Sequence, residues 1–177
     1  METSQNITDD FMKAYENYSD AIFRHCYFRL YDRERATEMM QETFVRTWEQ
    51  VRTGREIKNV RAFLYRVANN LVIDHVRKRK ESSLEALMET GFEPGVEEQE
   101  KTYAVIDAQF VLEALKDLDA KSRDVIIMRY IDDLGPNEIA EITGESANVV
   151  SVRLNRAVKS AQNILSHQNA ETISQTI

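Results

Sequence analysis

Glycine, proline and cysteine are scarce in this chain. Its 177 residues include five Gly, two Pro and a single Cys. All-β folds need turn residues roughly every eight to twelve positions, so this composition argues against them. Cys26 cannot form an internal disulfide, and three scattered His do not supply the rest of a Cys/His metal site. We therefore expect neither a metal nor a cofactor.

Long hydrophobic runs are also missing. No apolar segment approaches the ~20 residues that a helix needs to span a bilayer, and the chain begins with the polar, acidic stretch METSQNITDD. These absences argue against a secreted protein, a membrane protein or a small fold held by disulfides. With 42% hydrophobic and 30% charged residues, the sequence predicts a mostly helical cytoplasmic protein with packed cores and no membrane insertion.

Positive charge is confined to two segments, although the net charge is −7. Residues 61–80 carry six Lys and Arg against Asp74 alone, and residues 146–177 carry three against a single Glu. Residues 81–100 hold seven Glu and no basic residue. A polyanion responds to local potential rather than to the average, so the acidic total does not exclude a nucleic-acid partner.

Hydrophobic periodicity predicts helices on both sides of the acidic segment. Thr8 is expected to cap the first helix, which ends near Tyr31, and Gly54 is expected to stop the second. Further helices are expected over about 61–80, 102–118, 121–131, 136–143 and 146–166. The predicted fold class is all-α, with two small helical domains, over 8–80 and 105–168, joined by an acidic flexible linker over 81–104.

The segment PNEIAEITGESANVVSVRLNRA has the spacing of a helix-turn-helix. Ala140 allows two helices to approach closely, Gly144 makes the turn and Val150 anchors the second helix in the core. No acidic residue lies between Ser146 and Ala170, so this helix can lie against phosphates. The alternative is an ordinary helical hairpin with a solvated polar face. The candidate DNA-contacting residues here are Ser146, Asn148, Ser151, Arg153, Asn155, Arg156 and Lys159.

The helix expected over 61–80 carries a stripe of Arg and Asn side chains. Arg binds phosphates, Asn can both donate to and accept from a base edge, and Tyr65 is a candidate for stacking on a base. The alternative is a solvated helix whose final cations favour the helix dipole. The candidate DNA-contacting residues here are Arg61, Tyr65, Arg66, Asn69, Asn70, Arg77 and Lys78.

The preceding helix, RATEMMQETFVRTWE, shows an acidic stripe opposite its predicted buried face. Glu38, Gln41 and Glu42 form this stripe with Glu49, and Val45 interrupts it. An acidic stripe cannot bind DNA. It is therefore either plain solvated surface or a docking face for a basic protein partner.

The order of these elements resembles the extracytoplasmic-function (ECF) sigma factors, the two-domain members of the sigma-70 family of bacterial RNA polymerase. The run from Ala36 to Trp48 is similar to the family's Ala-Glu-Asp-Leu-x-Gln-Glu/Asp-x-Phe-x-x-x-Trp motif in sigma region two. Phe63–Asn70, followed by Asp74 and Arg77, is similar to the family's promoter-melting and minus-ten recognition helix. The similar residues in sigma region four are Glu138–Glu141 and the pairs Arg153-Leu154 and Arg156-Ala157.

Several positions depart from the family pattern. One carboxylate of the docking motif is lost at Thr37, and Asp119 stands where the family usually has Pro. Thr143 and Glu145 replace residues that are usually apolar. Residues 147–152 read ANVVSV where the family typically places Gly, Thr and Lys, so the reading face is less basic. This departure implies either an unusual minus-thirty-five sequence or weak DNA binding that relies on polymerase for avidity.

The resemblance implies a promoter-specificity subunit with no catalysis of its own. Glu38, Gln41 and Glu42 would dock on the clamp helices of core RNA polymerase, and the second domain would meet its flap. The loop 53–60 and the helix 61–80 would hold melted promoter DNA, and the helix-turn-helix would bind the upstream duplex. An anti-sigma protein is a further candidate partner.

Two other classes of function fit the sequence less well. A free-standing helix-turn-helix repressor with an N-terminal dimerisation or ligand domain would explain the last helix but not the Arg and Asn stripe before the linker. An enzyme would need a Gly-rich phosphate loop, a metal-ligand spacing or a His paired with a nucleophile, and none is visible. The adjacent His25 and Cys26 are expected on the core-facing side of the first helix.

Overall fold

The computed structural model describes residues 2–87 and 115–174, with side chains over residues 7–79 and 115–166. Within these ranges every regular element is a helix, as the sequence predicts. The predicted linker from residue 88 onward, and the predicted helix over 102–118 up to residue 114, lie outside the described residues.

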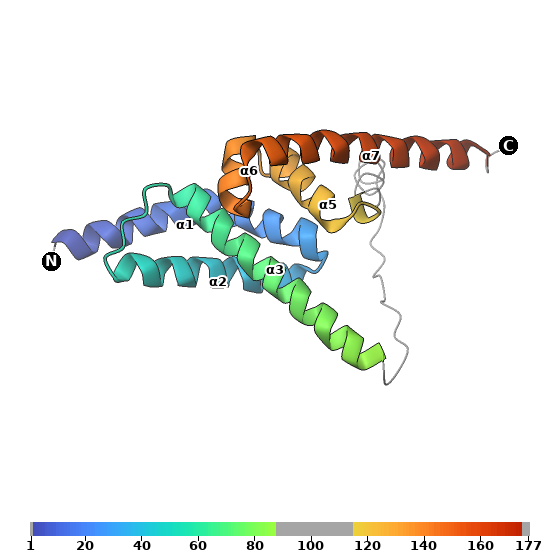
Figure 1. Cartoon of the computed structure of the whole chain (residues 1–177). Helices are drawn as coiled ribbons and strands as arrows, with labels where there is room; N and C mark the ends of the chain where they lie inside the picture. The colour runs from blue at the N-terminus through green and yellow to red at the C-terminus, as the bar shows by residue number, and fades with distance from the viewer. Residues whose placement is uncertain (1, 88–114, 175–177) are drawn as a thin grey trace.

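The first domain consists of α1 (Glu2–Leu30), α2 (Arg33–Arg52) and α3 (Val60–Leu87), which pack against one another (Figure 1). The Asp32 carboxylate caps α2 by accepting a hydrogen bond from the Arg35 N–H at 3.0 Å. Gly54 follows α2 with φ +81°, a left-handed conformation that glycine adopts without strain. The core between the three helices includes Ile22, Phe44 and Leu64.

Two helix boundaries in the first domain differ from those expected. Thr8 lies inside α1 rather than at its cap, because Ile7 continues the partly buried stripe of Phe11 and Tyr18 toward the N-terminus. At the other end, α3 continues through residues 81–87, which the sequence assigns to the linker.

The second domain contains α5 (Ala120–Ile126), the π-helical η1 (Ile127–Ile131), α6 (Pro136–Thr143) and α7 (Ala147–Ser174). Pro136 opens α6, where its missing N–H costs no hydrogen bond. Gly144 adopts φ +75° and donates its N–H to the Ala140 carbonyl at 2.9 Å, which closes the turn into α7. Val150 is fully buried beneath that turn. The helix-turn-helix therefore has the predicted geometry.

The two domains pack directly on each other. Helix α6 lies across α3, and η1 lies against α1 (Figure 1). Buried apolar residues of both domains belong to one continuous cluster. Nothing in the sequence pattern predicts this contact, and it changes the surroundings of several candidate site residues.

Candidate nucleic-acid and partner interface

The acidic stripe of α2 is accessible to solvent. Glu38 and Gln41 are exposed, and the Glu42 side chain retains 45% of its accessible surface. Glu38 pairs with Arg35 and Glu42 with Arg46, each at 2.6 Å within the same helix. Exposed pairs of this kind are worth about 0.3–0.5 kcal/mol, so a cation on another protein can replace the intrahelical arginine at little cost.

The outer face of α3 presents part of the predicted basic stripe. Asn70, Arg77 and Lys78 are exposed, and Arg77 pairs with Asp74 at 3.1 Å. The apolar Ile73 and Val76 lie beside them with 48% and 45% of their surface exposed. The exposed surface of this part of α3 therefore offers an amide, two cations and two apolar side chains.

Tyr65 and Asn69 do not lie on that exposed face, and here the expectation of an accessible stripe was wrong. Tyr65 is 2% exposed and Asn69 is 3% exposed. The Tyr65 and His25 rings form a T-shaped pair with their centroids 5.1 Å apart, and the Asn69 Oδ1 accepts a hydrogen bond from Arg29 at 2.7 Å. Both side chains therefore belong to the packing between helices rather than to a surface that can contact a base.

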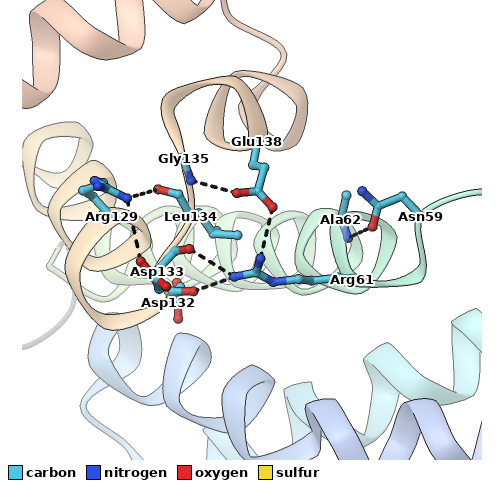
Figure 2. Close-up of polar contacts among 9 residues, drawn as sticks. All are labelled: Asn59, Arg61, Ala62, Arg129, Asp132, Asp133, Leu134, Gly135 and Glu138. Atoms are coloured by element: carbon cyan, nitrogen blue, oxygen red, sulfur yellow. Dashed lines mark hydrogen bonds and ion pairs between the residues drawn. The ribbon is translucent and has the colours of Figure 1, made fainter.

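Arg61 and Arg66 point from α3 toward the second domain. The Arg61 guanidinium donates to the carbonyls of Asp132 and Asp133 at 3.1 Å each and pairs with Glu138 at 3.2 Å (Figure 2). Arg66 pairs with Glu141 at 3.0 Å. Two cations predicted to meet DNA are thus occupied by acidic and carbonyl oxygens around α6.

Loop residues before α3 border the same contact. A groove there is lined by Arg55, Lys58, Asn59 and Phe63 together with Arg66 and Glu141. The Arg55 guanidinium lies over the Phe63 ring at 5.9 Å. The loop predicted to hold melted DNA therefore contributes two cations and an amide to this groove, Phe63 and Arg66 of α3 line it as well, and Glu141 of the second domain closes one side of it.

A set of polar residues, all buried except the partly exposed Asp124, lies deeper in the contact and is here called the interdomain polar cluster. It consists of His25, Arg29, Asn69, Asp124 and Asp132. The Asp132 Oδ2 lies 2.6 Å from the His25 Nδ1, and the Arg29 Nη1 lies 3.1 Å from the His25 Nε2. Arg29 also pairs with Asp124 at 3.3 Å. Because His25 and Arg29 of α1 bind Asp132, directly after η1, and Asp124 of α5, the cluster fixes how the two domains meet.

The partners of His25 fix its protonation state. A guanidinium can only donate, so the Nε2 that faces Arg29 must be the unprotonated acceptor, and Nδ1–H must donate to Asp132. Burial, followed by the positive charge of Arg29, lowers the pKa of His25 despite the opposing effect of Asp132. His25 is therefore neutral in this arrangement. The adjacent Cys26 is buried as expected, and burial raises the pKa of its thiol to about 12.

Some predicted DNA-contacting residues of the helix-turn-helix are exposed, whereas others form hydrogen bonds within the domain. Asn148, Asn155, Arg156 and Lys159 are exposed on α7. Ser146 caps the helix, because its Oγ accepts from the Val149 N–H at 3.3 Å.

Two further predicted residues of α7 have partners within the domain. The Ser151 hydroxyl donates to the Ala147 carbonyl at 2.8 Å. Arg153 forms a two-point ion pair with Glu145, one contact of which is 2.7 Å. The sequence reasoning missed Val149, which is 44% exposed beside Val152 at 43%.

One departure from the family pattern has a structural role. Asp119, in place of the usual Pro, caps α5 by accepting a hydrogen bond from the Ser122 N–H at 3.1 Å. Hydrogen bonding from the Ser122 side chain, followed by this backbone hydrogen bond, lowers the pKa of the Asp119 carboxyl. Helix α5 therefore begins with a hydrogen-bonded cap at Asp119, where the family usually has the rigid Pro.

Two kinds of site are absent from the part of the chain that the structure describes. It contains no group of three His, Cys, Asp or Glu residues that could hold a metal ion. None of its helices combines the length and the apolar character needed to cross a membrane.

Comparison with known proteins gives two family matches, one in each domain. Residues 14–82 match the family model described as sigma-70 region 2, and residues 111–160 match that described as sigma-70, region 4. The chain is 29% identical to RNA polymerase sigma factor SigV of Bacillus subtilis over 81% of this chain and 83% of the relative. It is 28% identical to ECF RNA polymerase sigma factor SigW of the same organism over 84% of each chain.

Solved structures show the same fold. The sigma factor RpoE from Bartonella quintana, in complex with the anti-sigma factor NepR, matches with a TM-score of 0.75 and 22% identity, covering 89% of this chain and 97% of that one. CnrH, in complex with the cytosolic domain of CnrY, matches with a TM-score of 0.67 and 21% identity over 90% of each chain.

Fold and surfaces together define a two-domain helical transcription factor with a helix-turn-helix after a basic helix. The chain belongs to the sigma-70 family, in its ECF group. It is accordingly a promoter-specificity subunit, whose partners are core RNA polymerase and promoter DNA. The free-standing repressor is not favoured, because both sigma regions are present in one chain. Sigma factors as a class are non-catalytic initiation factors.

Proposed function

We propose that Glu38, Gln41 and Glu42 of α2 dock on the clamp helices of core polymerase, while the second domain meets the flap. The exposure of the stripe and the weakness of its intrahelical ion pairs support this assignment. The single observation that carries it is the placement of this acidic face on the same domain as the exposed basic face of α3. One domain can then hold polymerase and promoter DNA at once.

We propose that promoter DNA is contacted by two surfaces. Asn70, Arg77 and Lys78 on α3 would meet the melted minus-ten strand, and Asn148, Asn155, Arg156 and Lys159 on α7 would meet the upstream duplex. Arg61 and Arg66 would join the first surface only after leaving their acidic partners on α6. Tyr65 and Asn69 would support that surface from within the core. Promoter binding would therefore require the two domains to separate.

We also propose an anti-sigma protein as a partner, because a structurally similar sigma factor is seen in complex with an anti-sigma factor. Action in the cytoplasm, where polymerase works, is part of the same proposal. The chain itself would contribute binding energy and no catalytic chemistry.

Asn70→Ala is expected to block initiation on double-stranded promoters and to be partly rescued on a template already opened around the start site. Loss of a base-edge contact costs about 1–3 kcal/mol, concentrated at one promoter position. Transcription by core polymerase with each variant, on closed and pre-opened templates, measures this effect.

Arg156→Ala provides the matched comparison. Loss of a phosphate contact should weaken all promoters alike, opened or closed, and should reduce the slope of log K against log salt by about one unit. Equal behaviour of the two variants on pre-opened templates would contradict the proposed division between the two surfaces.

A further inference from the structure

The groove-reading face of α7 contains two exposed valines. Val149 and Val152 retain 44% and 43% of their surface, and they lie one turn apart near the start of the helix. In a helix-turn-helix, the N-terminal residues of the second helix contact base edges in the major groove. These valines are therefore placed where sequence is read, if α7 binds DNA as proposed above.

Neighbouring side chains restrict what this face can recognise. Arg153 is held by Glu145, and the Ser151 hydroxyl is held by the helix backbone. A shallow groove beside the two valines is lined further by Ser122, Asn148 and Arg156. At the start of the helix the accessible chemistry is thus one amide, one cation and two branched apolar groups.

A valine cannot form a hydrogen bond with a base edge. The one apolar group that bases present in the major groove of unmodified DNA is the C5 methyl of thymine. We propose that Val149 and Val152 determine promoter specificity by contacting thymine methyl groups in the upstream element. The inference rests on the proposed DNA-binding role of α7 and deepens it.

The neighbouring residues fit A·T base pairs as well. The Asn148 amide is exposed on the same turn, and an Asn side chain matches the N6 and N7 positions of adenine. An A·T pair could then be read from its adenine by Asn148 and from its thymine methyl by a valine. The positive charge of Arg156 and Lys159, with no acidic residue on α7 before Ala170, favours approach to the backbone.

Replacement of thymine by deoxyuridine tests the proposal at the level of one methyl group. An upstream element is first selected from a randomised duplex library with this chain bound to core polymerase. Each thymine of that element is then replaced singly by deoxyuridine, which pairs identically but lacks the C5 methyl. Burial of one such carbon is worth about fourfold in affinity, so holoenzyme should bind about fourfold more weakly at one or two positions.

Variants assign that effect to the valines. Holoenzyme that carries the double variant Val149→Ala/Val152→Ala should bind each thymine-containing duplex and its deoxyuridine counterpart with equal affinity. Ser160→Ala, which changes an exposed residue farther along α7, should keep the fourfold difference. Because all three positions are at least partly exposed, circular dichroism should show the helicity of the unchanged protein.

Three results would overturn the proposal. If the holoenzyme selects an element without thymine, or one in which every thymine tolerates deoxyuridine, the proposed function stands but methyl readout does not. A difference that persists in the double variant would assign the methyl contact to another residue. Failure of the holoenzyme to select any DNA would instead overturn the proposed function itself.

Discussion

Asp132→Ala is expected to weaken the contact between the two domains while leaving each of them folded. The Asp132 side chain is 1% exposed and accepts the only hydrogen that the neutral His25 ring can donate, at 2.6 Å. Its removal leaves the buried His25 Nδ1–H without an acceptor and removes a negative charge that compensates Arg29. The closed arrangement of the domains should lose about 1.5–3 kcal/mol of stability. Because the lost bond joins α1 to the end of η1, the loss falls on the contact between domains.

Hydrogen exchange measures this loss at the interface. Amides of α3 and α6 that face each other should exchange roughly 10- to 150-fold faster, since each 1.4 kcal/mol is a factor of ten. Glu141→Ala is the matched control, because it removes an interdomain ion pair whose side chains are 43% and 53% exposed. Such exposed ion pairs contribute at most about 1 kcal/mol to the stability of a contact. Equal effects of the two variants would contradict the role given to the buried cluster.

Acid should weaken the same contact in the unchanged protein. Burial lowers the pKa of His25 in the closed arrangement, whereas a solvated His titrates near pH 6.5. The closed form is therefore fully favoured above about pH 7, and opening takes up one proton as the pH falls below about 6.5. Arg29 opposes protonation of His25, while Asp132 and Asp124 favour it.

Glu42→Lys is expected to abolish stable binding to core polymerase without unfolding the protein. Reversing a charge that faces a basic partner costs about 2–5 kcal/mol, which corresponds to a loss of at least about 30-fold in affinity. The change to the helix itself is small, because the pair with Arg46 is exposed. Binding to core polymerase by titration measures the loss, and circular dichroism measures the fold.

Glu16→Lys is the control for this charge reversal. It makes the same change at an exposed position of α1, outside the acidic stripe, and should leave binding to polymerase unchanged. Loss of helicity in Glu42→Lys would mean that the residue is structural. Equal loss of binding in both variants would mean that total charge, rather than the α2 stripe, governs docking.

The local parts of this structure could be predicted from sequence. Pro136, Gly144 and Ser146 act through their own backbone and nearest neighbours, so the helix-turn-helix follows from residues a few positions apart. The exposed acidic stripe of α2 follows from the helical period in the same way.

The contact between domains could not be predicted. His25 and Asp132 are 107 positions apart, and helical periodicity carries no information on what covers a polar face. For the same reason the Arg and Asn stripe of α3 was expected to be accessible throughout, whereas Tyr65 and Asn69 are buried. The sequence showed which side chains share a helix face, but only the packed structure showed which of them remain available to a partner.

Transcription with purified core polymerase tests the central claim most directly. A promoter library is transcribed by core polymerase alone and by core polymerase with this chain. We expect a distinct set of transcripts to start only when the chain is present, and the chain to co-elute with core polymerase at moderate salt while binding duplex DNA poorly alone. Identical transcripts with and without the chain, and no co-elution, would contradict the assignment as a promoter-specificity subunit.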